Sequence, residues 1–276
     1  MRSLKIIRPI LRICGIFLIA AAIVVLTQDI QIFPGIFRSI PDSGPPTGTE
    51  QLIAETEDGE KIVVWYKQGQ PDQKLSGYSA VIMHGNFETV YSSVFLQNWL
   101  GSLGISTYSF DYRGYGNSTG WPSEKGVYLD SKAVWEVVQK KENKSPAEMI
   151  VFGVSIGTGI AAQLASQIDP KVLVLVAPYA DIPSVVAQRI YLRPLIPLLW
   201  YEIPTVKFLA SLSNTCLILA HGEKDNIIDF ANSQRLHDSV KAKLRSEIIT
   251  SKEASHNDIF RYTMPQISEA LVRCVN

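Results

Sequence analysis

Ser155 lies in a pattern that is typical of a serine nucleophile. The segment from Gly153 to Gly157 reads Gly-Val-Ser-Ile-Gly, and it follows an apolar run that ends at Phe152. A serine on a sharp turn between a strand and a helix needs glycines where a Cβ atom would clash, and the turn lifts its Oγ atom clear of the sheet. The pattern also arises by chance, so the prediction depends on the predicted strand before it and the predicted helix after it.

Two later residues can complete a proton relay with this serine. A serine hydroxyl is a weak nucleophile at neutral pH, and it needs a base that is oriented by a third group. Asp225 follows the apolar segment 215–220, and His256 follows the segment 245–250. Because open α/β sheets form their ligand crevice beyond the carboxyl ends of the strands, we expect Ser155, His256 and Asp225 to meet there as nucleophile, base and orienting acid.

Other residues compete for these roles. Asp229 and Asp181 are alternatives to Asp225, which could itself merely cap a helix or form a turn. His256 could be a solvated loop histidine. His237 lies within a predicted surface helix and is expected to be inert.

Acyl transfer also needs donors that face the developing oxyanion. The backbone N–H of Ile156, directly after the nucleophile, is predicted to be one of them. The other is assigned to the backbone N–H of Asn86, in the loop His84-Gly85-Asn86-Phe87 that follows a predicted strand. The alternative is that His84 and Gly85 merely form a tight turn.

The composition excludes several other kinds of chemistry. Lysine plus arginine and aspartate plus glutamate number 26 each, so a nucleic-acid partner is not expected. The four histidines show no metal-binding spacing, and no metal or cofactor is predicted. Cys14, Cys216 and Cys274 lie far apart in the sequence, so we expect three thiols, buried or facing a membrane, and no disulfide.

Strand-like and helix-like segments alternate after residue 50. Alternation of this kind predicts an α/β fold with a mainly parallel sheet, antiparallel N-terminal strands and helices on both faces. At 276 residues with 46% hydrophobic residues, one large domain is expected. The predicted strands are 52–56, 61–67, 78–83, 105–111, 148–152, 171–176, 215–220 and 245–250, and the predicted helices are 90–103, 124–141, 156–166, 230–240 and 264–275.

The N-terminus has the pattern of a membrane anchor. Residues 1–12 carry four basic residues and no acid, and the uncharged run 13–26 follows. As a helix this run spans roughly 21 Å, against about 30 Å for the hydrocarbon core. We favour an uncleaved signal anchor at 1–27, with the domain on the non-cytoplasmic side, over a cleaved signal or a buried helix. A proline-rich linker at 28–49 and a domain at 50–276 follow.

Several segments together resemble the successive landmarks of the α/β-hydrolase superfamily. The chain is most similar to the membrane-anchored group around alpha/beta-hydrolase-domain-containing protein 13, over roughly residues 28–276. The resemblance implies the α/β-hydrolase fold and structural roles for Asp111 and Arg113. Isoleucine and threonine stand at 156 and 158, where relatives commonly carry leucine and glycine, and both leave the backbone donor of residue 156 intact. The segments are His84–Asn86, Phe110–Ser118, Gly153–Gly157, His221–Asp225 and Ser255–His256.

An apolar insert separates the last two strands before the acid. Residues 178–209 are rich in leucine, proline and aromatic residues, and they are too few for a separate cap domain. The insert is predicted to form a short lid over the crevice, where it would suit an acyl chain or a membrane surface, although ordinary core packing would also explain it.

Three functional hypotheses follow. The first is a serine hydrolase, similar to esterases, thioesterases or lipases, that cleaves an ester or thioester of an acyl-containing small molecule or lipid-like substrate through an acyl-enzyme. The second is an aminopeptidase-like serine peptidase with the same triad, although no residue in the sequence marks a pocket for an amine. The third is a non-catalytic membrane adaptor, against which the intact triad argues.

Overall fold

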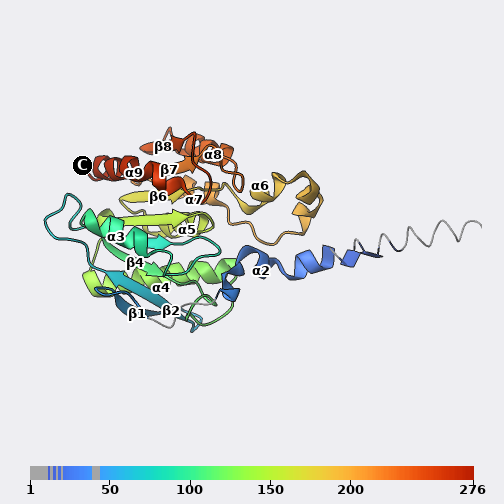
Figure 1. Ribbon diagram of the computed structural model, residues 1–276, viewed down its shortest axis with the longest axis horizontal. Coiled ribbons are helices and arrows are strands. Elements are labelled where there is room, and N and C mark those ends of the chain that lie inside the picture. Colours follow the sequence, from blue (N-terminus) through green and yellow to red (C-terminus); the bar gives the residue numbers. More distant parts are fainter. Residues whose placement is uncertain (1–11, 13–14, 17, 20, 39–43) are drawn as a thin grey trace, which may run out of the picture.

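An eight-stranded sheet organises the domain (Figure 1). The computed structural model describes residues 12, 15, 16, 18, 19, 21–38 and 44–276. The strand order is β1-β2-β4-β3-β5-β6-β7-β8; β2 runs antiparallel to β1 and β4, and the other pairs are parallel. The predicted sheet, mainly parallel with an antiparallel start, is confirmed. The strands are Glu50–Glu55 (β1), Lys61–Lys67 (β2), Ser79–Met83 (β3), Ser106–Phe110 (β4), Met149–Val154 (β5), Val172–Val176 (β6), Cys216–Gly222 (β7) and Ser246–Ser251 (β8).

Helices cover both faces of the sheet, as predicted. Along β6, Val172, Val174 and Val176 belong to the same buried cluster as residues of α3 and α9, whereas Leu173 and Leu175 belong to the cluster that contains residues of α4, α5, α7 and α8. Strands buried on both faces must be apolar at every position, which explains the continuous apolar runs in the sequence. The helices are Val94–Ser102 (α3), Glu124–Glu142 (α4), Gly157–Ile168 (α5), Ile182–Ala187 (α6), Thr205–Ser211 (α7), Ala231–Val240 (α8) and Ile259–Val275 (α9), and a 3-10 helix spans Pro146–Glu148 (η2).

Two predicted helix boundaries are wrong. The helix expected at 90–103 begins at Val94. Val90 lies in the turn before it, and the Val90 N–H donates to the Asp111 carboxylate. The helix expected to begin at Met264 begins at Ile259. Pro265 lies inside it, where it removes one N–H donor from the helix ladder and its ring crowds the carbonyl of Arg261.

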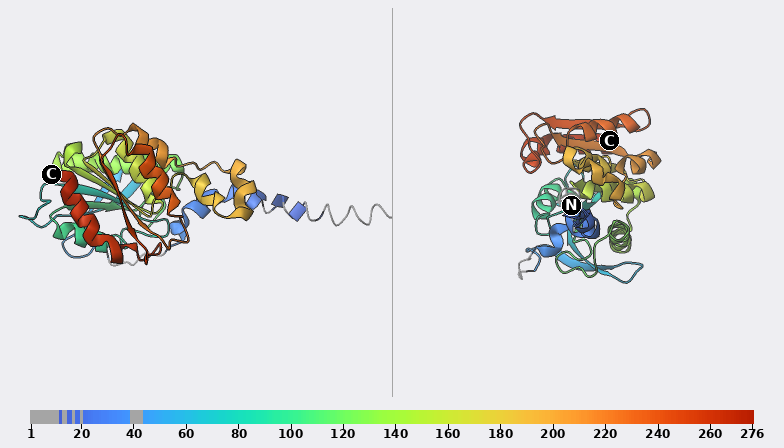
Figure 2. Two further views of the ribbon diagram at one scale, coloured as in Figure 1. Left: turned by 90° about the horizontal axis from the view of Figure 1, so that it is seen from above. Right: turned by 90° about the vertical axis from the view of Figure 1, so that its right-hand side faces the viewer.

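The N-terminal segment and the insert project from the same side of the domain (Figure 2). The segment contains α2 (Gln28–Ile32) and η1 (Pro34–Phe37), and the insert contains α6, η3 (Ile190–Leu198) and α7. Phe33 is fully buried in the core, so this part of the predicted linker packs on the domain. No helix in the described part of the chain is both long and apolar enough to cross a bilayer. The anchor predicted at 1–27 falls largely on residues outside that part, and it stays a prediction.

The expectation of three free thiols is wrong. Cys216, at the start of β7, and Cys274, in the last turn of α9, form a disulfide with their Cα atoms 5.7 Å apart. The sequence hid this pair because 58 residues separate the cysteines, and only the packing of α9 across β7 brings them together. Cys14 lies outside the described residues.

We expect the disulfide to stabilise the folded domain substantially. A crosslink closing a loop of this length lowers the entropy of the unfolded chain by an amount worth about 4 kcal/mol. Replacement of both Cys216 and Cys274 by alanine should therefore lower the urea concentration at the unfolding midpoint, measured by circular dichroism. Reductant should lower the midpoint of the wild type alone. Equal midpoints for the oxidised wild type and the double variant would contradict the pairing.

Candidate active site

Ser155 occupies a strained turn between β5 and α5. Its φ angle is +52°, a left-handed conformation that is uncommon for residues other than glycine. The neighbouring glycines permit the turn: a Cβ atom at Gly157 would lie 2.4 Å from the Met83 carbonyl oxygen, and one at Gly153 would lie 2.6 Å from that of Gly157. The sharp turn inferred from the sequence is present, and it holds the Ser155 side chain at the carboxyl edge of the sheet.

The structure brings Ser155, His256 and Asp225 together. His256 Nε2 lies 3.0 Å from Ser155 Oγ, and His256 Nδ1 lies 2.6 Å from Asp225 Oδ2. Because the carboxylate carries no proton, Nδ1–H must donate to Asp225, which leaves Nε2 free to accept from the serine hydroxyl. This tautomer is the one in which the imidazole can take a proton from Ser155.

Asp225 is held as a buried carboxylate. Its Oδ1 atom accepts from the backbone N–H groups of Ile227 and Ile228, each at 2.8 Å. Burial acts to raise the pKa of Asp225, but hydrogen bonds from His221 and His256 outweigh it and hold the pKa well below its usual range. Asp225 therefore stays charged at neutral pH and can orient the imidazole of His256.

His221 supports the acid in a way that sequence reasoning missed. Its Nε2 atom lies 2.9 Å from the Ile228 carbonyl oxygen and 3.3 Å from Asp225 Oδ2, and its Nδ1 atom lies 2.7 Å from Ser233 Oγ. Since a carbonyl only accepts, Nε2 carries the proton. The signal was present in the sequence, because His221 and Asp225 belong to the same five-residue segment.

A close contact between two loops brings the acid to the base. A Cβ atom at Gly222 would lie 2.3 Å from the Ala254 carbonyl oxygen, so only glycine lets the loop after β7 approach the loop after β8. The Lys224 N–H also donates to Ala254, at 3.0 Å. The positions of Asp225 and His256 therefore depend on each other.

The competing residues serve local structure. Asp181 is the N-cap of α6 and accepts from the Ser184 N–H at 2.7 Å. Asp229 accepts from the Ala231 N–H at 2.8 Å, at the start of α8. His237 lies on α8 with its Nδ1 atom 3.2 Å from Ser246 Oγ. None of the three hydrogen-bonds to a triad member among the described residues.

The backbone N–H groups of Asn86 and Ile156 have no acceptor within the described part of the chain. The Gly85 carbonyl, on the peptide that carries the Asn86 N–H, lies 2.8 Å from His84 Nδ1 and accepts from the Glu88 N–H at 3.2 Å. In a trans peptide the N–H points opposite to the C=O. The buried His84 ring therefore fixes the direction of the Asn86 donor.

The N-terminal segment also holds this loop. The Asn86 carbonyl accepts from the Gly35 N–H at 3.2 Å and from Tyr115 Oη at 2.7 Å. A Cβ atom at Gly35 would lie 2.0 Å from the Tyr115 ring, so the close approach requires glycine. Residues of η1 thus hold the loop of the predicted Asn86 donor, a contact that nothing in their sequence indicated.

Asp111 and Arg113, expected to be structural, lie in a loop network behind the site. Asp111 Oδ1 lies 3.6 Å from His84 Nε2, and Arg113 bridges Asp130 and Asp58 at 2.8 Å and 2.7 Å. Neither lines the pocket at Ser155. Their contacts fit the structural role.

A pocket of about 520 Å³ opens beside the triad. Five of its lining residues are apolar, and five carry polar side chains, with Glu88 and Asn257 among them. Residues 178–209 contribute none of the lining, so the insert does not form a wall of this pocket, and its role as a lid stays a prediction. Gln28 holds the insert through a hydrogen bond to the Leu198 carbonyl. The pocket is lined by Gly85, Asn86, Phe87, Glu88, Phe95, Val154, Ser155, Ile227, His256, Asn257 and Phe260.

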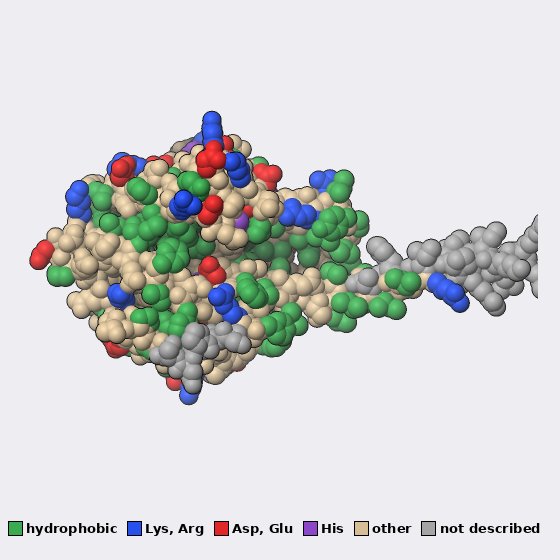
Figure 3. Space-filling view, in the orientation of Figure 1, with side chains coloured by type: hydrophobic (Ala, Val, Ile, Leu, Met, Phe, Trp, Pro, Cys, Tyr) green, Lys and Arg blue, Asp and Glu red, His purple; other side chains and the backbone are tan. Residues whose placement is uncertain are grey.

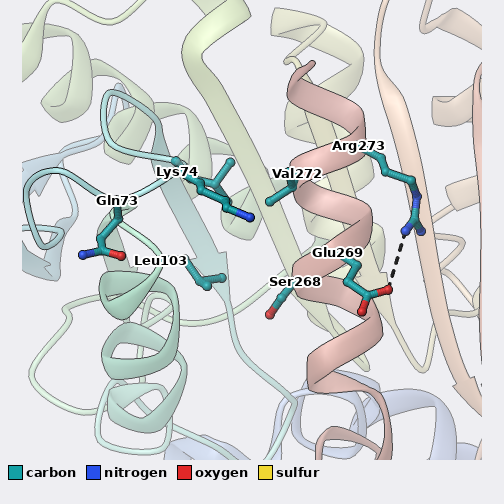
Figure 4. Close-up of a pocket in the computed structure, with 8 residues that line it drawn as sticks. Gln73, Lys74, Leu103, Ser268, Glu269, Val272 and Arg273 are labelled. Carbon is teal, nitrogen blue, oxygen red and sulfur yellow. Dashed lines mark ion pairs between the residues drawn. The ribbon is translucent and has the colours of Figure 1, made fainter.

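A second pocket, of about 550 Å³, lies between the loop before β3 and α9 (Figure 4). Glu269 and Arg273 form an ion pair in it at 3.8 Å, and Lys74 lies on the opposite wall. Its lining contains no histidine and no triad member, so we assign the chemistry to the pocket at Ser155. Among the described residues no group of three or more His, Cys, Asp or Glu side chains could hold a metal ion.

Comparisons with known proteins agree with this geometry. The family model described as "Serine aminopeptidase, S33" matches residues 78–209. An uncharacterized protein of Mycobacterium tuberculosis is 31% identical over 226 residues, which cover 79% of this chain and 78% of that protein. Human alpha/beta hydrolase domain-containing protein 17B is 26% identical over 215 residues, or 77% of this chain and 71% of the relative. An esterase from Pyrococcus furiosus has a TM-score of 0.70 and 19% identity, over 87% of this chain and 96% of the esterase.

These similarities establish the family but not a narrower group. The esterase supports the fold alone, while the mycobacterial protein and the human protein extend the likeness along most of the sequence. The resemblance to the group around protein 13 stays a prediction. The sheet topology, the turn at Ser155 and these relatives together show that the chain belongs to the α/β-hydrolase superfamily.

Proposed function

We propose that this protein is a serine hydrolase that cleaves a carboxylic ester or thioester of an acyl substrate. The observation that carries the proposal is the continuous relay from Asp225 through His256 to Ser155, with donor–acceptor distances of 2.6 Å and 3.0 Å. The apolar side chains of Phe87, Phe95 and Phe260 in the pocket beside Ser155 suit an acyl chain.

The reaction proceeds in two halves. Ser155 Oγ attacks the carbonyl carbon while its proton passes to His256 Nε2, and the N–H groups of Asn86 and Ile156 stabilise the oxyanion. The bond to the leaving group then breaks, and the imidazolium gives that proton to the departing oxygen or sulfur. Water attacks the acyl-enzyme with His256 as base, and the acid leaves as Ser155 regains its proton.

A peptidase is the second candidate. The matched family model describes a serine aminopeptidase, and the Glu88 carboxylate among the pocket residues could pair with a substrate ammonium. Comparing an acyl ester with an aminoacyl amide separates the two. Faster turnover of the amide, weakened in Glu88→Gln, would favour the peptidase.

The proposed location is a membrane, with the catalytic domain on the non-cytoplasmic side. The basic flank and apolar run at the N-terminus support this orientation. The Cys216–Cys274 disulfide supports it independently, because disulfides persist mainly in oxidising compartments.

Ser155→Ala tests the nucleophile. A fluorophosphonate probe should label the wild type, and the variant should remain unlabelled, because alanine has no oxygen to attack phosphorus. A panel of p-nitrophenyl esters should show turnover that rises with acyl length, as the apolar pocket fills. Equal labelling of both proteins would overturn the assignment, and the absence of labelling in both would favour the adaptor.

Asp225→Asn tests the orienting acid. The wrong histidine tautomer should reduce kcat by about 10⁴-fold, while KM changes little. Since the pKa of Asp225 is lowered in the folded state, its stabilising effect is present above about pH 4, the ordinary value for aspartate, and is lost as the pH falls below it. The difference in unfolding free energy between wild type and variant, from urea titrations, should therefore shrink at acid pH. A difference that grows on acidification would contradict the assignment.

His84→Leu tests the oxyanion loop, with His84→Asn as the matched control. Loss of the bond to the Gly85 carbonyl should lower kcat by roughly ten- to a hundredfold, less than the loss of a whole oxyanion donor, with KM nearly constant. Asparagine carries an amide N–H near the position of Nδ1 and should restore part of the rate. A boronic acid inhibitor should weaken in parallel with kcat/KM; a rise in KM at constant kcat would show that His84 has another role.

A further inference from the structure

Exposed apolar side chains concentrate on one side of the molecule (Figure 3). Of the fifteen large ones among the described residues, nine belong to two segments that we call the projecting lobe, residues 15–28 and 188–201. In the insert these are Ile190, Tyr191, Leu198 and Trp200, and the first two are 74% and 73% exposed. Exposed apolar side chains gathered in this way mark a binding surface.

The charges of the lobe have one sign. Residues 188–201 contain Arg189 and Arg193 and no acid, and residues 15–28 contain no charged side chain. Within the described residues, neither insert arginine pairs with a carboxylate; their guanidinium groups donate to the carbonyls of Asn226 and Ala187, at 2.8 Å and 2.9 Å. The lobe therefore offers an apolar surface with uncompensated positive charge.

Specific bonds lock its two segments together. The buried Gln28 amide donates to the Leu198 carbonyl at 2.9 Å and accepts from the Trp200 N–H at 3.1 Å. Tyr201 Oη also donates to Asp29 Oδ1 at 2.6 Å. A partner that binds the N-terminal helix near Gln28 would therefore also contact the insert.

We propose that the insert, which is held against the end of the N-terminal helix at Gln28, lies in the headgroup region of an anionic lipid bilayer. Apolar side chains would enter the acyl boundary, tryptophan and tyrosine would lie at the interface, and arginine would reach the lipid phosphates. A bilayer fits better than a protein partner, because the insert adjoins, at Gln28, the sequence predicted as the membrane anchor. The docking does not depend on catalysis by Ser155.

This position would bring the pocket to the membrane. Arg189 bonds Asn226, which is adjacent to both Asp225 and the pocket residue Ile227. Three more exposed apolar side chains, Phe87, Phe95 and Ile227, line the pocket itself. An acyl substrate could then pass from the bilayer to Ser155 past these apolar side chains.

A fluorescent label at residue 190 tests the docking. The full chain carries Ile190→Cys, with Cys14→Ser so that one free thiol remains beside the disulfide, and the thiol is labelled with the polarity-sensitive dye NBD. Ile53→Cys is the matched control, because Ile53 is also an exposed isoleucine, at 46%, but lies on β1. Each protein is reconstituted into vesicles of phosphatidylcholine, with or without phosphatidylglycerol, and with or without brominated acyl chains.

The proposal expects a blue shift and bromine quenching at residue 190 and neither at residue 53. Quenching should be stronger with phosphatidylglycerol, and Arg193→Glu should remove that increase. Identical spectra at the two positions would overturn the proposal. So would a blue shift at residue 190 that bromine does not quench, because the label would then be covered by protein, such as a second copy of the chain.

Discussion

The short contact between Ser155 Oγ and His256 Nε2, at 3.0 Å, is the constraint on which the rest of the site depends. It requires a serine held in a left-handed conformation, which costs of order 1–3 kcal/mol. The turn is possible because Gly153 and Gly157 have no Cβ atom, so neighbouring backbone can pack closely against them. The glycines of the pattern thus serve the geometry of one hydroxyl.

The second half of the site depends on a different set of contacts. The Asn86 donor is held by His84 from within the loop, while Gly35 and Tyr115 hold the carbonyl of Asn86 from outside. Gln28, a few residues earlier, holds the insert. A single N-terminal segment therefore connects the oxyanion loop to the projecting lobe, and removing it should disturb both.

The sequence alone predicted those features of the site that depend on local residue patterns. The turn at Ser155 follows from glycine spacing, and placing Asp225 and His256 after strands follows from the general position of sites in parallel sheets. The disulfide and the contact of Gln28 with the insert could not be predicted, because each depends on contacts between distant segments. Cys216 meets Cys274 only through the packing of α9, and Gln28 bonds the Leu198 carbonyl across 170 residues of sequence.

These long-range contacts have a common consequence for the acid and the base. Asp225 follows the carboxyl end of β7, and His256 lies three residues before α9 begins at Ile259. At the far ends of the same two elements, the Cys216–Cys274 disulfide joins the start of β7 to the last turn of α9. The strand and helix that carry the acid and the base are thus fastened covalently at one end and by the approach of Gly222 to Ala254 at the other. Because a proton relay tolerates little variation in distance, a frame closed at both ends keeps the imidazole within reach of both partners.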